Sequence, residues 1–180
     1  MAEKIVLGID PGTRILGYGL IKMVDQKLEL MQYGVLNLSK IKDHSLKLKK
    51  IYELLSDLIL QFCPDEVAME APFYGKNVQS MLKLGRVQGV VMAAALSKEI
   101  AVIEYAPKKV KQAVTGDGNA SKEQIAQMLK NLLQIKEKPE FFDATDAVGV
   151  AVCHFYQQHR GSRQTKSWKN FINENPNRLM

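Results

Sequence analysis

The apolar residues of this chain change their spacing near residue 44, and this change constrains the fold more than any other feature. Before it, three apolar runs of strand length follow one another with only short turns between them: 4–10, 14–24 and 28–38. Such runs predict an antiparallel three-stranded meander. Over residues 44–62 apolar side chains recur every three or four positions instead, which predicts an amphipathic helix.

Strands and helices alternate after that helix. Two short apolar runs predict strands over 66–70 and 101–105, with a long helix over 77–98 between them. The pattern then predicts three more helices: 107 to about 114, one that begins at the capping box of residues 121–124, and 143–159. This order predicts an α/β fold with a five-stranded mixed sheet, three antiparallel strands and then two parallel ones, flanked by helices.

The length and the cysteine content set broad limits on the class of protein. With 180 residues, the chain has the size of one domain, and such a chain buries about 70% of its extended surface without a disulfide or structural metal. Cys63 and Cys153 lie far apart and outside any metal-binding spacing, so we expect two buried thiols and a cytoplasmic protein. No apolar run approaches the ~20 residues of a membrane span. Asp10 interrupts the start of the chain where an export signal would still be apolar, so neither a membrane nor export is expected.

Basic residues are concentrated near the C-terminal end. The formal net charge is +6, and residues 160–180 carry +4 of it, from five Lys and Arg residues against Glu174. We expect residues 1–159 to form the folded domain and residues 160–180 to form a flexible basic tail. A basic protein can bind polyanions through counterion release. Charge alone does not choose between nucleic acid, an acidic protein and simple solubility.

Four acidic residues lie in mostly apolar surroundings at places that suit a functional site. Asp10 ends the first predicted strand and Glu70 ends the fourth, and ligand sites of α/β sheets favour such strand ends. Asp143 and Asp146 are three residues apart, so they share one face of the last helix, in its first turn. Taken singly, each acid has an ordinary structural explanation, such as capping a turn or a helix.

Taken together, these carboxylates predict a site for hard cations. Burying an unpaired charge is costly, so a carboxylate in such surroundings needs a partner. Oxygen ligands without nearby Cys or His residues favour Mg²⁺ or Mn²⁺ over zinc. Two such ions about 3.5–4 Å apart are the usual device for in-line cleavage of a phosphodiester.

Several stretches of the chain resemble, in order, the RuvC family of Holliday junction resolvases. They are GIDPGTRILGYG at 8–19, the strand that ends in Glu70, KNVQSMLKLGRVQGV at 76–90, EYAPKKVKQAVTGDGNASKEQI at 104–125 and DATDA at 143–147. The resemblance runs from about residue 4 to 159. It implies a ribonuclease-H-like fold and a homodimer that binds a four-way DNA junction and nicks two opposing strands, leaving 5′-phosphate ends.

The resemblance also implies the roles of individual residues and the partners. The four catalytic acids of the family match Asp10, Glu70, Asp143 and Asp146, which would bind two Mg²⁺ ions per subunit, with Mn²⁺ able to substitute. The expected protein partners are a branch-migration helicase complex and its junction-binding subunit.

DNA contacts carry over to three further positions: Phe73, Lys111 and Lys122. The aromatic at Phe73 would lie beside unpaired bases near the cut, and the lysines would contact phosphate. Many members of the family have QVFMAKN after the glutamate, whereas this chain has APFYGKN at 71–77. The aromatic is kept, but its neighbours Pro72, Tyr74 and Gly75 differ.

Two other functions are compatible with parts of the sequence. A ribonuclease-H-like relative could process nucleic acid without being specific for junctions. A nucleotide-binding protein of the actin-like superfamily would share the turn Asp10-Pro-Gly-Thr13. Such proteins need a second large domain and a second phosphate loop, for which 180 residues leave no room.

Overall fold

The computed structural model describes residues 3–24, 27–72, 77–135 and 142–162 and contains the expected mixed sheet. Its five strands are β1 (Lys4–Asp10), β2 (Ile15–Val24), β3 (Lys27–Asn37), β4 (Glu66–Glu70) and β5 (Ala101–Tyr105). They lie in the order β3-β2-β1-β4-β5. The pairs β2–β3 and β1–β2 are antiparallel, whereas β1–β4 and β4–β5 are parallel. The expected three antiparallel and two parallel strands are therefore confirmed.

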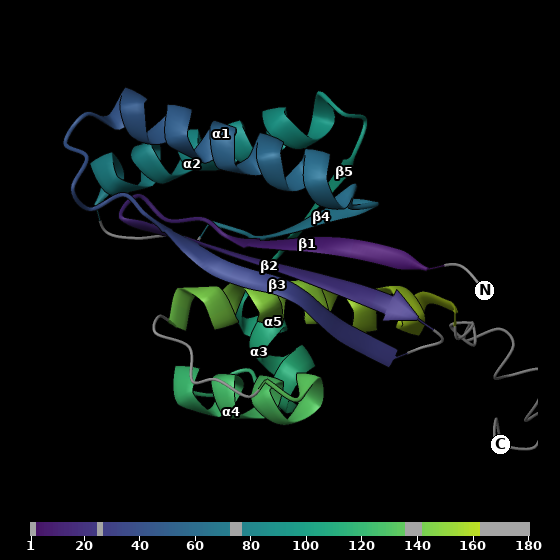
Figure 1. Cartoon of the computed structure of the whole chain (residues 1–180). Coiled ribbons are helices and arrows are strands. Elements are labelled where there is room, and N and C mark those ends of the chain that lie inside the picture. Colours follow the sequence, from purple (N-terminus) through teal and green to yellow (C-terminus); the bar gives the residue numbers. More distant parts are fainter. Residues whose placement is uncertain (1–2, 25–26, 73–76, 136–141, 163–180) are drawn as a thin grey trace, which may run out of the picture.

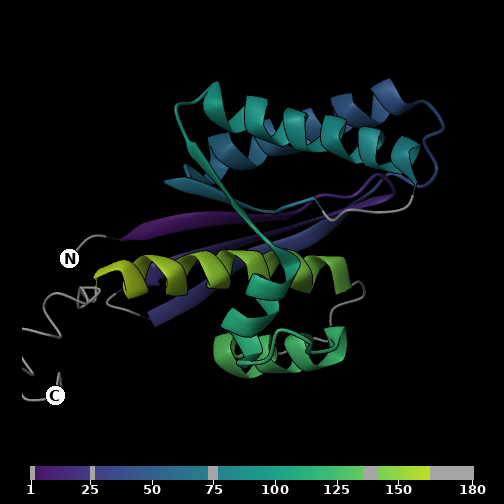
Figure 2. The same ribbon diagram turned by 180° about the vertical axis from the view of Figure 1, so that it is seen from behind.

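Five helices complete the described part of the fold: α1 (His44–Phe62), α2 (Val78–Leu96), α3 (Pro107–Thr115), α4 (Lys122–Leu133) and α5 (Phe142–Ser162). Helices α1 and α2 cover one face of the sheet, and α3, α4 and α5 lie on the other (Figure 1). Seen from behind, α5 lies lengthwise along its face of the sheet (Figure 2). None of the described helices is long and apolar enough to cross a membrane.

Three details differ from the sequence-based expectations. Helix α2 ends at Leu96 rather than residue 98, and the chain turns out of the helix at Glu99, which has a left-handed φ of 60°. Helix α5 continues to Ser162, past the expected helix end at 159. The remainder of the expected tail, 163–180, lies outside the described residues. Cys63 is exposed rather than buried, at the left-handed C-cap of α1.

The alternation of side chains along the strands decides which residues face α5. In β1, Leu7 and Ile9 pack toward α1 and α2, while Val6 belongs to the core under α5. Because successive side chains of a strand point to opposite faces, Asp10 points to the α5 face. The same argument applies to β4, where Ala68 lies in the α5 core and Glu70 follows it by two residues. Both acids therefore emerge on the side of the sheet that carries α5.

Glycines on the strands let α5 approach the sheet closely. A Cβ atom at Gly8 would overlap the Ala147 carbonyl oxygen and lie 2.9 Å from the Ala151 Cβ. A Cβ atom at Gly17 would overlap the Asp143 carbonyl oxygen. Gly17 is the β2 partner of Asp10 in the sheet register. The first turn of α5 thus rests directly on the strand beside Asp10.

A polar network crosses the core at the other end of α5. His154 is 1% exposed, and its ring joins the Glu66 carboxylate (Nε2 to Oε2, 2.6 Å) to the Tyr105 hydroxyl (Nδ1 to oxygen, 2.9 Å). The same Glu66 oxygen accepts from Lys4 Nζ and Gln158 Nε2, each at 2.6 Å. Burial raises the pKa of Glu66, but the Lys4 and His154 contacts outweigh burial and hold that pKa below its ordinary value. The network stabilises the protein while Glu66 is ionised.

We expect Glu66→Gln to lower the free energy of unfolding at pH 7 by about 1.5–3 kcal/mol, since charged hydrogen bonds are lost. A carboxyl whose folded-state pKa is depressed contributes stability above its ordinary pKa of 4.5 and loses it as the pH falls. The difference between wild type and variant should therefore shrink below pH 4.5. Urea unfolding at pH 7 and pH 4 measures it. Glu53→Gln, on the solvent-facing side of α1, should change stability little at either pH. An equal loss in this control would contradict the assignment.

Candidate active site

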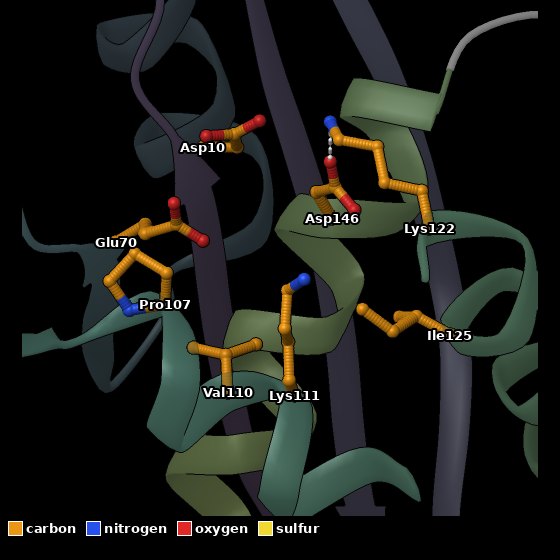
Figure 3. Close-up of a pocket in the computed structure, with 8 residues that line it drawn as sticks. All are labelled: Asp10, Glu70, Pro107, Val110, Lys111, Lys122, Ile125 and Asp146. Carbon is orange, nitrogen blue, oxygen red and sulfur yellow. Dashed lines mark hydrogen bonds and ion pairs between the residues drawn. The ribbon is translucent and has the colours of Figure 1, made fainter. Parts of the chain in front are cut away.

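The sheet brings Asp10 and Glu70 together. They end the neighbouring parallel strands β1 and β4, in which Ile9 pairs with Met69, so both carboxylates lie at the same edge of the sheet. Figure 3 shows their side chains on one side of a common pocket. The expectation that two acids distant in the chain meet at strand ends is consistent with this geometry.

Helix α5 supplies the other two acids. Asp146 faces Asp10 and Glu70 across the pocket (Figure 3). Asp143 lies one turn earlier, where its main chain packs on Gly17. It is not among the residues that line the pocket, but its charge contributes to the raised pKa of Asp10. The structure thus places three of the four predicted acids in the pocket and the fourth at its margin.

The pocket has a volume of about 130 Å³ and both acidic and basic walls. Its lining residues are Asp10, Glu70, Pro107, Val110, Lys111, Lys122, Ile125 and Asp146. Lys122, at the start of α4, places its Nζ 2.5 Å from Asp146 Oδ2. Lys111 Nζ donates to the Ala120 carbonyl at 2.8 Å. Both lysines predicted as DNA contacts therefore lie beside the carboxylates.

The sequence analysis did not identify the apolar residues that line the pocket, which are Pro107, Val110 and Ile125. Pro107, Val110 and Lys111 share one face of α3, since residues three and four apart lie together on a helix. Ile125 projects from the first turn of α4. The only sequence signal for this wall was that Val110 and Lys111 follow Pro107 by three and four residues, which places them on one face of the helix. Phe73, the predicted base contact, and Tyr74 lie outside the described residues.

Burial, and after it mutual repulsion, disfavours the charged forms of Asp10 and Glu70. Burial, followed by the charges of Glu70, Asp146 and Asp143, raises the pKa of Asp10 to about 8, although Lys122 opposes the shift. Burial and the charge of Asp146 raise the pKa of Glu70 to about 7, against the opposing charges of Lys122 and Lys111. The two lysines therefore do not neutralise the pocket, which favours a further cation.

The donor set fits a hard divalent ion. Its oxygens come only from carboxylates, with no sulfur or imidazole in the lining, which is the chemistry that Mg²⁺ and Mn²⁺ prefer. In the described part of the chain, however, no group of three acidic, His or Cys side chains is arranged to hold an ion as it stands. In this state the Lys122 ammonium also takes up one of the Asp146 oxygens that an ion would need.

We expect Asp10→Asn to stabilise the metal-free protein while removing its response to Mg²⁺. The pKa of Asp10 rises from 3.8 to about 8 in the folded state, so folding loses stability as the pH rises through that interval. At pH 8 the variant should unfold on the order of 5 °C higher than wild type, and at pH 4 no higher. Added Mg²⁺ should raise the unfolding temperature of wild type, because a ligand of the folded state stabilises it, but not that of the variant. Thermal scans with and without Mg²⁺ test this prediction. An Asp10→Asn protein that still responds to Mg²⁺ would contradict it. The control is Asp57→Asn, an exposed position on α1.

Comparisons with known proteins agree with this geometry. The family model "Crossover junction endodeoxyribonuclease RuvC" matches residues 6–154. A protein of that name from Cytophaga hutchinsonii is 56% identical over 177 residues, covering 98% of this chain and 88% of its own. Another from Christiangramia forsetii is 53% identical over 180 residues, covering 99% and 94%.

The solved structures give the same result for the fold. The RuvC structure of Thermus thermophilus superimposes with a TM-score of 0.76 at 31% identity, covering 87% of this chain and 96% of that one. The same protein has been solved in complex with a Holliday junction substrate, with a TM-score of 0.76 at 30% identity and the same coverage.

Proposed function

Since this chain belongs to the RuvC family of crossover junction endodeoxyribonucleases, we propose that the carboxylate pocket between β1, β4 and α5 is its catalytic centre. The protein is a Holliday junction resolvase, an endonuclease that acts on four-way DNA junctions in recombination and repair. A non-junction nuclease or an actin-like nucleotide-binding protein is not favoured by these relatives. The observation that carries the proposal is the meeting of Asp10, Glu70 and Asp146 in one pocket.

The family is metal-dependent, and we assign two Mg²⁺ ions per subunit to these acids, with Mn²⁺ as a substitute. Bound there, the metal would polarise the scissile phosphate and stabilise charge on the attacking and leaving oxygens. Asp10 would be the ligand nearest the other acids, since burial and then the charges of Glu70, Asp146 and Asp143 raise its pKa. Glu70 would bind on the β4 side and orient the attacking water. Asp143 and Asp146 would complete the ligand set from α5.

DNA contacts are proposed for Lys111, Lys122 and Phe73. Lys122 is half exposed at the first residue of α4, and both its charge and the N–H groups of a helix start attract phosphate. Lys111 lines the same pocket, and its Nζ donates to the Ala120 carbonyl just before the start of α4. For Phe73 the support is its position in the sequence, three residues after Glu70, together with the tendency of aromatic side chains to stack on unpaired bases.

Two such pockets are needed to cut two opposing strands of a four-way junction, and we propose a homodimer. Helix α2 leaves Val78 67% and Leu82 55% exposed, and a Cβ atom at Gly85 or Gly89 would meet nothing within 4 Å. An apolar surface with small residues of this kind suits close packing against a second copy. The family resemblance supports a branch-migration helicase complex, with its junction-binding subunit, as a partner in the cytoplasm.

The test is a nicking assay on a four-way junction, a linear duplex of the same sequences and a structured RNA. We expect paired symmetric nicks with 5′-phosphate ends in the junction with Mg²⁺ or Mn²⁺, none with a chelator, and little cleavage of the other substrates. Equal cleavage of the linear duplex would contradict junction selectivity. Cleavage that persists in the chelator would contradict the metal assignment.

A further inference from the structure

Lys122 occupies the carboxylate that the proposed metal site requires. Its ammonium lies 2.5 Å from Asp146 Oδ2, and the Asp146 side chain is only 13% exposed. Burial lowers the pKa of Lys122, but the hydrogen bond to Asp146 and the charges of Asp146, Asp10 and Asp143 raise it further, so the pKa ends above its ordinary value. Lys122 is therefore a cation whose charge acts on all four acids.

The second lysine of the pocket is held differently. Lys111 Nζ donates to the main-chain carbonyl of Ala120 at 2.8 Å rather than to a carboxylate. Its charge lowers the pKa of Glu70, but its ammonium contacts no carboxylate oxygen among the described contacts. Lys111 therefore only places a positive charge near the acids, whereas Lys122 also occupies a carboxylate oxygen that a metal ion would use.

We propose that Lys122 is an internal counter-ion that competes with the divalent cation for Asp146 and must leave that carboxylate before the ion can bind there. The inference rests on the metal site proposed above. The Lys122 ammonium can move from Asp146 into solvent, because its side chain is 54% exposed at the first residue of α4. A DNA phosphate near that helix start would hold the released ammonium.

The competition would link metal binding to DNA binding. Coupling between two ligands is reciprocal, so a phosphate that withdraws Lys122 from Asp146 raises the affinity for the cation, and the cation in turn frees Lys122 for DNA. In the absence of DNA, the ammonium on Asp146 weakens the binding of the cation without preventing it. This arrangement favours assembly of the metal centre on DNA rather than in free protein.

The experiment measures binding of Mn²⁺ alone to the DNA-free full-length protein, by electron paramagnetic resonance of the unbound ion. We expect Lys122→Met to bind Mn²⁺ about tenfold more tightly than wild type, which is within the usual range of coupling between sites. Lys111→Met, the matched control, removes a charge from the same pocket without freeing a carboxylate and should tighten binding less than about threefold. Lys122→Gln should behave as Lys122→Met, and circular dichroism checks that each variant is folded.

The possible outcomes separate this inference from the proposed function. If Lys122→Met and Lys122→Gln tighten Mn²⁺ binding no more than Lys111→Met does, the competition is refuted while the metal site stands. If Asp146→Asn binds Mn²⁺ as wild type does, or if no protein binds it, the metal site itself is refuted and the inference falls with it. A larger gain in the Lys122 variants, lost when Asp146→Asn is added, supports the inference.

Discussion

Asp146→Asn should lower the rate of junction nicking about a thousandfold while leaving junction affinity unchanged or higher. Metal ions in such sites contribute several kcal/mol to catalysis, and about 1.36 kcal/mol corresponds to a factor of ten in rate. The amide replaces an anionic ligand by a neutral one of the same shape, so the metal-bound state is weakened and the fold is kept. DNA binding should not suffer, because the change removes a negative charge from the pocket and releases Lys122 from its ion pair.

Two measurements at one fixed salt concentration check this prediction, since affinity for DNA depends strongly on salt. Single-turnover cleavage of a labelled four-way junction in Mg²⁺ gives the rate, and fluorescence anisotropy with a chelator gives the affinity. Asp57→Asn removes an acid from the exposed side of α1 and should cut at the wild-type rate. Nicking by Asp146→Asn at the wild-type rate would refute its role as a ligand.

The order of the helices and strands was predictable because the spacing of apolar residues within each segment indicates which of the two it forms. The short apolar run over 4–10 and the three-to-four spacing over 44–62 depend only on local sequence, and the strand and the helix that they predict were both confirmed. The meeting of Asp10 and Glu70 was also predictable. Parallel strands end at one edge of a sheet, and the alternation of side chains points both acids to the face that carries α5.

The contacts between separate helices were not predictable in this way. The Lys122–Asp146 ion pair joins residues 24 apart in the chain, and it depends on how α4 packs on α5. Local periodicity shows which face of each helix is apolar but not the angle or offset at which two faces meet. For the same reason the sequence did not indicate that Asp143 lies at the margin of the pocket while Asp146 lies inside it.

Close packing of α5 on the sheet makes folding and catalysis depend on the same glycine. Gly17→Ala should lower the free energy of unfolding by about 3 kcal/mol, the upper end of the usual cost of overpacking. The added methyl group would overlap the carbonyl oxygen of Asp143, which is main chain and cannot rotate away. To relieve the overlap, the first turn of α5 must move off β2, and this displaces Asp143 and Asp146 from Asp10. We therefore expect nicking to fall at least about a hundredfold even at temperatures where the variant is fully folded.

Gly149→Ala on the same helix is the matched control. A Cβ atom there would lie 3.6 Å from Val110 and 3.7 Å from Leu129, which is ordinary contact. Alanine also favours helix over glycine by up to about 1 kcal/mol, so this variant should be as stable as wild type or more so and should nick at the wild-type rate. Urea unfolding and single-turnover cleavage at 15 °C, a temperature chosen to keep both variants folded, separate the two effects. Wild-type cleavage by a destabilised Gly17→Ala protein would mean that the helix start shifts without moving its acids, and it would contradict the dependence of the site on this contact.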